Sequence, residues 1–384
     1  MSNLLPVALG PVPLFPASRD TGSMSLSDRR VSVTTLESFC NARPELISQI
    51  DRIRRVGAAV LNRHVDGESI RYEEGLQCVL GSNQRLVLLP IDDDDCSRGT
   101  FKICQYAWDP SANRIIAGLS YINHESGVAE NKFRTELAAY QAIQNVPNVV
   151  QYLGSVTSGN RRLIFVEYCP NGDLFRLIET RPLALRNGLE KMIPVAEAIA
   201  ALHRQGMAHR DLKPENILVT PDGARITDFD TLIRVEAGDR EIVGTPLYFA
   251  PELRAAAGRA ASYDWQAIDM WNLGLILLEV YGSSFAVSEI DLIVSGSMSD
   301  ETKSRDICSV ISKVLPGLDG SVISLIKELL SLNPAQRPKA DHALAMLQAV
   351  QPRADRGPSV SLWRRIQTAV PSAIASLLGQ FMHR

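Results

Sequence analysis

Hydrophobic residues near the start of the chain follow a helical period. Between residues 44 and 63 the apolar positions recur every three or four residues, at Leu46, Ile50, Ile53, Val56 and Val60. This spacing places them on one face of a helix, and Pro44 is a favourable first-turn residue. We therefore expect an amphipathic helix from Pro44 to about Arg63. Its apolar face either packs on the rest of the chain or forms a separate partner site.

Further along, short apolar runs bounded by turn residues predict strands rather than helices. We expect three consecutive strands at residues 85–91, 101–107 and 114–122, an order that favours an antiparallel meander. A helix at 131–143 and two more strands at 149–156 and 163–167 follow. After Asp173 the pattern is predominantly helical to about Val350. A small β-rich lobe followed by a large helical lobe is an α+β layout.

The two ends of the chain differ from this central part. Residues 1–35 mix prolines with serines, a composition that predicts a disordered leader and also suits a bacterial type III export signal. We expect a helical extension over residues 36–84, the main domain over 85–350, and a linker with an amphipathic tail over 351–384.

The tail is basic and amphipathic from residue 360 to residue 384. Apolar residues recur at helical spacing beside arginines, and no acidic residue follows Asp355. Such a helix can lie on an anionic membrane surface, which makes peripheral membrane contact one hypothesis. Packing on the main domain is the other, and Pro371 would kink a continuous helix.

Composition excludes several classes of protein. The 384 residues carry a formal net charge of −3 and are 45% hydrophobic, so no global charge favours nucleic-acid binding. Six scattered cysteines lack metal-ligand spacing and predict free thiols in a reducing compartment. No apolar stretch approaches the ~20 residues of a membrane span, and the start lacks the features of a secretory signal. We expect a cytoplasmic protein, with secretion by a bacterium into a host cytosol as the alternative.

The strongest chemical signal is His-Arg-Asp-Leu-Lys-Pro-Glu-Asn at residues 209–216. It resembles the catalytic loop of eukaryotic-type serine/threonine protein kinases, which implies the bilobal kinase fold. Phosphoryl transfer needs a carboxylate near the attacking hydroxyl and a cation near the γ-phosphate. The resemblance gives these roles to Asp211 and Lys213, and makes Asn216 a Mg²⁺ ligand.

Twelve residues after Asn216, Asp228-Phe229-Asp230 stands where the family has Asp-Phe-Gly. The resemblance makes Asp228 a second Mg²⁺ ligand. Asp230 departs from the pattern, because glycine reaches left-handed backbone conformations cheaply and aspartate reaches them at some cost. Two interpretations stay open: a segment fixed in an active conformation, or a loss of activity.

Other matches imply structural roles in the helical lobe. The segment 244–252 resembles the end of an activation segment, with Thr245 lining the substrate pocket. Asp269 matches the aspartate that braces the catalytic-loop backbone. Arg337 stands where the family places the buried partner of Glu252.

The run at residues 163–174 is similar to the family's fifth strand and hinge. The resemblance makes Val166 the gatekeeper residue. It also implies that the backbone of Glu167 and Cys169 forms hydrogen bonds with the edge of the adenine ring. Apolar walls with a few fixed polar groups suit a nucleotide pocket.

The ATP-binding lysine is displaced. Leu119 occupies the third-strand position where the family carries it. Aligning the glycine-rich loop with residues 97–104 keeps Gly99 as the middle glycine and Phe101 as the aromatic tip, and puts Lys102 at the third glycine. This arrangement is similar to the with-no-lysine kinases, in which a loop lysine enters the phosphate site from another strand.

Two further residues bear on this assignment. Glu136, in the predicted helix, matches the family's glutamate that pairs with the lysine. Lys132 is the only other lysine before residue 190, and we expect its side chain to point mainly to solvent. The acidic run at 92–95 is either a solvated turn or the mark of a metal-rich or nucleotide-repelling lobe.

Two functions remain open on this basis. The first is an ATP- and Mg²⁺-dependent kinase that phosphorylates serine or threonine on protein substrates, favoured by Asp211, Lys213, Asn216 and Asp228. The alternative is an impaired pseudokinase that binds partner proteins as a scaffold, supported by Leu119, Asp230 and the acidic run at residues 92–95. A kinase fold performing other nucleotidyl or acyl chemistry is a third hypothesis, because fold does not fix function.

Overall fold

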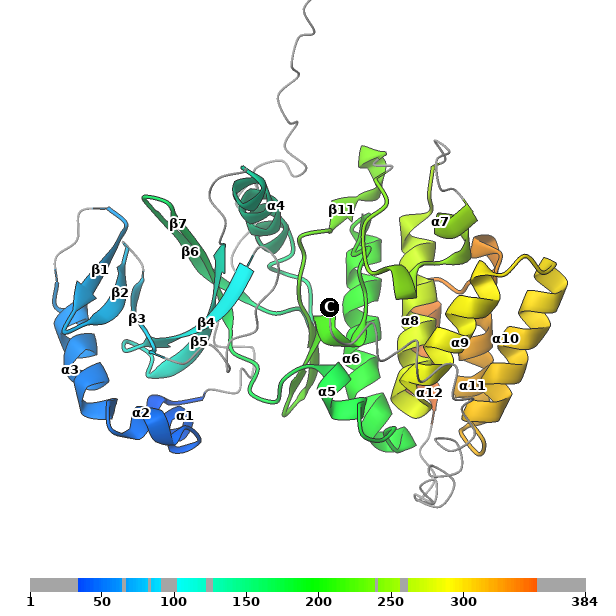
Figure 1. Cartoon of the computed structure of the whole chain (residues 1–384), viewed down its shortest axis with the longest axis horizontal. Helices are drawn as coiled ribbons and strands as arrows, with labels where there is room; N and C mark the ends of the chain where they lie inside the picture. The colour runs from blue at the N-terminus through cyan, green and yellow to red at the C-terminus, as the bar shows by residue number, and fades with distance from the viewer. Residues whose placement is uncertain are drawn as a thin grey trace, which may run out of the picture. The chain divides into compact units, whose positions relative to one another are not determined.

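The chain forms two compact units. The computed structural model describes residues 34–63, 67–81, 84–90, 102–121, 127–238, 241–255 and 262–350. The first unit runs to Asn171 and takes in 220–222 and 226–237, and the second unit comprises the rest (Figure 1). Gly99, Phe101, the acidic run, residues 1–33 of the leader and the tail lie outside the described residues.

The first unit is built on one antiparallel sheet. Its described strands run in the order β1-β2-β3-β4-β5-β7-β6. They are β1 Ser69–Glu73, β2 Leu76–Leu80, β3 Arg85–Leu88, β4 Lys102–Asp109, β5 Arg114–Tyr121, β6 Tyr152–Ser158 and β7 Arg161–Glu167. The predicted meander is confirmed as β3-β4-β5. Helix α4 (Val128–Ala142) contacts β5, β6 and β7 (Figure 1).

The N-terminal extension differs from the single helix that we expected. It comprises α1 (Leu36–Asn41), α2 (Pro44–Ile47) and α3 (Ile50–Leu61). Ile53, Val56 and Val60 are at most 2% exposed in a core shared with the sheet, so the apolar stripe packs on the domain.

Residues 69–80, assigned to the helical extension, instead form the β1–β2 hairpin. The two-residue turn at Glu74 and Gly75 has φ of 46° and 77°, which is the left-handed geometry of a tight hairpin and explains the correction.

The second unit is helical, as the pattern predicted. Its described helices are α5 Leu174–Ile178, α6 Leu185–Arg204, α7 Pro251–Ala255, α8 Trp265–Tyr281, α9 Ser284–Ser295, α10 Asp300–Val314, α11 Gly320–Leu329 and α12 Ala340–Ala349. Along the chain between α6 and α7 lie the short strands β8 Met207–Ala208, β9 Ile217–Thr220, β10 Gly223–Ile226 and β11 Ile233–Arg234. Of these, β11 belongs to the first unit. Helix α8 is buried along almost its whole length and forms the centre of the unit.

The cysteines and the lengths of the helices can be compared with the expectations from sequence. The five described cysteines are free thiols. No helix in the ranges above is both long and apolar enough to cross a membrane.

Candidate active site

The catalytic-loop backbone is braced from α8. The carboxylate of Asp269, 1% exposed, accepts hydrogen bonds from the backbone N–H groups of His209 at 2.8 Å and Arg210 at 2.9 Å. Arg210 has φ of 72°, a left-handed conformation that a non-glycine residue holds only when its surroundings fix it. The bracing contact implied by the sequence is therefore present.

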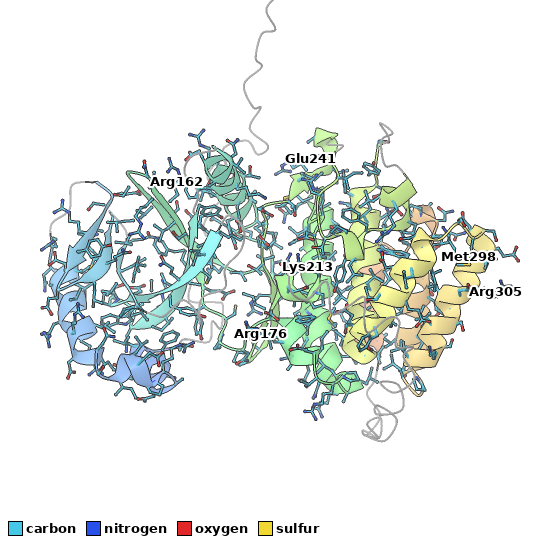
Figure 2. The ribbon with its side chains drawn as sticks, in the orientation of Figure 1. Arg162, Arg176, Lys213, Glu241, Met298 and Arg305 are labelled. Atoms are coloured by element: carbon cyan, nitrogen blue, oxygen red, sulfur yellow. The ribbon has the colours of Figure 1, made fainter. Side chains whose placement is uncertain are left out.

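Within this loop the carboxylate of Asp211 is held by several donors. Its Oδ1 accepts the backbone N–H and the hydroxyl of Thr245, both at 2.8 Å. Its Oδ2 lies 3.0 Å from Lys213 Nζ, and Lys213, labelled in Figure 2, also donates to the Thr245 hydroxyl at 2.7 Å. The Asn216 amide donates to the Asp211 carbonyl at 2.8 Å. A base and a cation thus stand side by side in fixed orientation.

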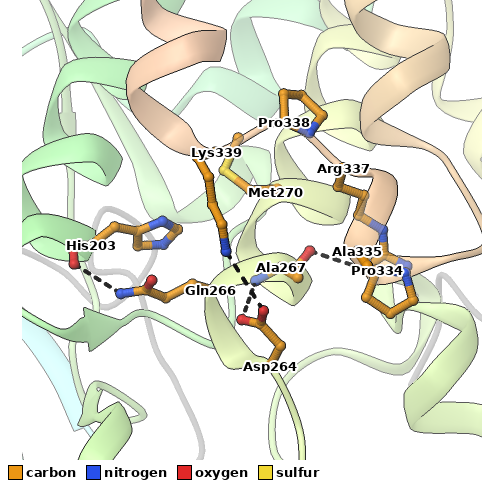
Figure 3. A pocket seen from close by; sticks show the side chains of 10 residues that line it. All are labelled: His203, Asp264, Gln266, Ala267, Met270, Pro334, Ala335, Arg337, Pro338 and Lys339. Carbon is orange, nitrogen blue, oxygen red and sulfur yellow. Dashed lines mark hydrogen bonds and ion pairs between the residues drawn. The ribbon is translucent and has the colours of Figure 1, made fainter.

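A buried ion pair anchors the segment that carries Thr245. Arg337 binds both oxygens of Glu252, at 2.6 and 2.7 Å, with its own side chain fully buried. The same guanidinium donates to the Ala267 carbonyl at 2.9 Å (Figure 3). This bidentate geometry is the one that best compensates the desolvation of both charges. The structural ion pair predicted from sequence is confirmed.

A second buried carboxyl group in this unit was missed. Glu279 in α8 accepts a hydrogen bond from the Tyr248 hydroxyl at 2.9 Å, and burial raises the pKa of Glu279 to about 8. Its sequence signal is an acidic residue in the otherwise apolar second half of α8, which by itself does not name a partner.

In the first unit, Lys102 joins two carboxylates. Its ammonium lies 3.0 Å from both oxygens of Glu136, on α4, and 2.5 Å from Oδ1 of Asp228. Burial opposes the charge of Lys102, but the carboxylates of Glu136 and Asp228 together hold its pKa well above the usual value. Glu136 is fully buried and also accepts a hydrogen bond from the Tyr121 hydroxyl.

The strand register explains how Lys102 reaches this glutamate. Lys102 on β4 pairs with Tyr121 on β5, and Cys104 pairs with Leu119. Paired residues, and residues two apart on one strand, share a face of the sheet, so Lys102 and Leu119 lie on the same face. The lysine therefore approaches Glu136 from the neighbouring strand on the face that a lysine at position 119 would occupy.

The segment after β10 holds both aspartates of the Asp-Phe-Asp sequence. Asp228 has φ of 65°, whereas Asp230 is outside the left-handed region, so aspartate in place of glycine carries no backbone strain there. Lys132 does not point mainly to solvent: its Nζ lies 2.5 Å from Oδ2 of Asp230. That prediction failed because helix position alone does not reveal what packs beside the helix.

The hinge residues lie at the end of β7. Val166 and Glu167 are 3% and 8% exposed and pair with Ala117 and Ile116 of β5. Cys169 follows just beyond the strand and is buried. The backbone N–H of Glu167 donates to the Gln151 carbonyl at 2.9 Å. The gatekeeper and hinge roles given to these three residues stay predictions.

The residues assigned to Mg²⁺ come from both units, with Asn216 in the second and Asp228 in the first. Among the described residues no group of three or more His, Cys, Asp or Glu side chains gathers as a metal site. Mg²⁺ accepts carboxylate and amide oxygens as ligands, so the side chain of each residue, taken by itself, is of a type that suits this ion.

Comparison with known proteins agrees with these features. The family described as "Protein kinase domain" matches residues 97–347. Similar proteins are "Cell division control protein 2 homolog 3" of Trypanosoma brucei brucei, 29% identical over 65% of this chain and 88% of its own length, and "CBL-interacting serine/threonine-protein kinase 24" of Arabidopsis thaliana, 28% identical over 62% and 52%. "Serine/threonine-protein kinase ppk24, mitochondrial" of Schizosaccharomyces pombe is 33% identical over 50% and 42%.

The chain thus spans about half, or less, of the plant and fission-yeast relatives. The family match covers more than half of the 384 residues and includes strands β4 to β7 of the sheet and almost all of the helical unit. The expected bilobal kinase fold is confirmed, and the chain belongs to the protein kinase family.

Proposed function

We propose that the chain is an ATP- and Mg²⁺-dependent serine/threonine protein kinase in which Lys102 performs the role of the absent third-strand lysine. The observation that carries this proposal is the contact of the Lys102 ammonium with both oxygens of Glu136 at 3.0 Å. A cation fixed in this way neutralises charge on the α- and β-phosphates without reorganising during the reaction.

Each remaining residue has one role in the proposed transfer. Asp211 accepts the proton of the substrate hydroxyl while that oxygen bonds to the γ-phosphorus and the bond to the ADP oxygen breaks. Lys213, 3.0 Å from Asp211, neutralises negative charge on the transferred group. Asn216 and Asp228 would hold Mg²⁺, which would supply further neutralisation of the phosphates.

The matched relatives favour a protein kinase over a pseudokinase scaffold. Two of them are named as serine/threonine kinases, and the Lys-Pro-Glu-Asn sequence after Asp211 is typical of that class. Leu119 and Asp230, the residues that favoured a scaffold, are both compatible with activity, because Leu119 shares its sheet face with Lys102 and Asp230 has a lysine partner.

Purified protein incubated with labelled ATP, Mg²⁺ and generic protein substrates tests the proposal. We expect phosphoserine or phosphothreonine in the product, and a loss of at least about a hundredfold in rate on Asp211→Asn. Equal incorporation by the wild type and this variant would contradict it.

A further inference from the structure

The aspartate that replaces the family's glycine has a specific partner on α4. Lys132 Nζ and Asp230 Oδ2 are 2.5 Å apart, and their side chains are 35% and 20% exposed. We propose that Lys132 and Asp230 form a positioning pair, which ties α4 to the Asp228–Asp230 segment and so keeps Glu136 at Lys102. The inference rests on the proposed function for its effect on catalysis.

The Lys132–Asp230 pair connects the same two elements as Lys102 does through its contacts with Glu136 and Asp228. Lys132 and Glu136 are four residues apart on α4 and so share one face of the helix. Lys102 joins Glu136 to Asp228, while Lys132 reaches Asp230 directly. The helix and the segment are thus connected by two lysines, one from β4 and one from α4 itself.

Phe229, between the two aspartates, adds an apolar contact to the same helix. It is fully buried, and its ring meets Tyr140 of α4 edge to face, with centroids 5.3 Å apart. All three residues of the segment therefore contact α4 or the lysine bound to it. A glycine at position 230 has no side chain with which to make the third connection.

The exposure of the pair separates it from ordinary surface ion pairs, which contribute little. Arg134 and Glu130 on the same helix form such a pair at 2.7 Å, with the arginine side chain 72% exposed. Both members of the Lys132–Asp230 pair are more than half covered, so their attraction is less screened by water. Arg134→Met is therefore the matched control for Lys132→Met.

Hydrogen exchange of α4 amides in the absence of nucleotide tests the tie without any reference to activity. We expect Lys132→Met and Asp230→Gly each to speed the exchange of α4, the double variant to be no faster than the faster single variant, and Arg134→Met to leave it unchanged. Additive effects of the two single changes, or exchange that neither change alters, would overturn the inference.

Kinase assays then test the positioning role. We expect each single variant to lower kcat by roughly tenfold, in the range of coupling between charged groups in contact, and the charge reversal Lys132→Asp with Asp230→Lys to recover part of that loss. An Asp230→Gly variant that matches or exceeds the wild type would overturn the role. If the wild type transfers no phosphate, the proposed function fails, while the exchange experiment still decides whether the tie exists.

Discussion

The ammonium of Lys102 and the carboxylate of Glu136 meet at 3.0 Å, although Lys102 begins β4 and Glu136 lies in the middle of α4. Most of the family would draw this cation from position 119, where the chain has leucine. The lysine–glutamate pair is therefore present, but the lysine comes from β4 instead of β5.

Tyr121→Phe should weaken phosphoryl transfer without unfolding the protein. The Tyr121 hydroxyl donates to Glu136, a fully buried carboxylate. Removing this hydroxyl leaves one carboxylate oxygen without that hydrogen bond. We expect a loss of about 1–3 kcal/mol in the free energy of unfolding and a lower kcat. Tyr152→Phe is the control, because the Tyr152 hydroxyl donates to the half-buried Ser155 at 3.1 Å. Equal losses in the two variants would argue against a special role for Tyr121.

The N-terminal extension should support the hinge. Phe39 of α1 meets the rings of Tyr106 and Tyr168 edge to face, with centroids 5.2 and 5.5 Å away, and Tyr168 lies between the hinge residues Glu167 and Cys169. Phe39 is 2% exposed, so Phe39→Ala should cost ~3–5 kcal/mol of unfolding free energy.

The same substitution should raise the KM for ATP, because a hinge without this aromatic support fixes adenine less well. Ile47→Ala, in the same extension but at a side chain 50% exposed, is the control and should change neither quantity. Thermal unfolding and nucleotide titration measure both. An unchanged KM for ATP in folded Phe39→Ala protein would mean that the N-terminal extension contributes to stability and not to ATP binding.

The buried carboxyl group of Glu279 predicts a pH dependence of stability. Burial raises its pKa from an ordinary value of 4.5 to about 8, so between these pH values the folded state holds a proton that the unfolded state has lost. The contribution of Glu279 is thus complete below pH 4.5 and disappears as the pH rises through about 8.

Glu279→Gln should therefore flatten the fall in unfolding free energy between those two pH values, as measured by denaturant titration. Glu289→Gln is the control, because its side chain is 43% exposed and lies in a surface pair. A wild-type curve that rises over this interval, with the slope unchanged in Glu279→Gln, would contradict the assignment.

The kinase should need no phosphorylation in its activation segment. Residues 232–244 contain no serine, threonine or tyrosine, and Arg210 of the catalytic loop already reaches the backbone carbonyl of Glu241 at 3.5 Å. Arg210 also lies over the ring of Trp265, 5.1 Å from its centroid. Phosphatase-treated protein should keep its full turnover. A collapse in rate that an upstream kinase reverses would refute this expectation.

Sequence motifs predicted the residues whose roles depend on spacing along the chain. The Asp269 brace, the Glu252–Arg337 pair and the Lys102–Glu136 contact are all present where the resemblance placed them. Each involves charged residues at fixed offsets from a recognisable loop, and such offsets can be read without a structure.

The missed features depend on register and packing instead. The hydrogen bond from Tyr121 to Glu136 follows from the pairing of β4 with β5, and the Lys132–Asp230 contact follows from how α4 packs beside a loop almost a hundred residues later. The β1–β2 hairpin was missed because no residue of β1 is fully buried and the strand lacks a strong alternating pattern. The turn at Glu74 and Gly75 was its clearest signal.

Moving the lysine between strands tests the central claim most directly. Lys102→Met should reduce kcat/KM by at least about a hundredfold in a protein that unfolds cooperatively, since it removes a preorganised cation. Adding Leu119→Lys to that variant should recover a substantial part of the rate, because both positions face Glu136 from the same side of the sheet. Near-normal activity of Lys102→Met, or a loss that Leu119→Lys does not relieve at all, would contradict the account.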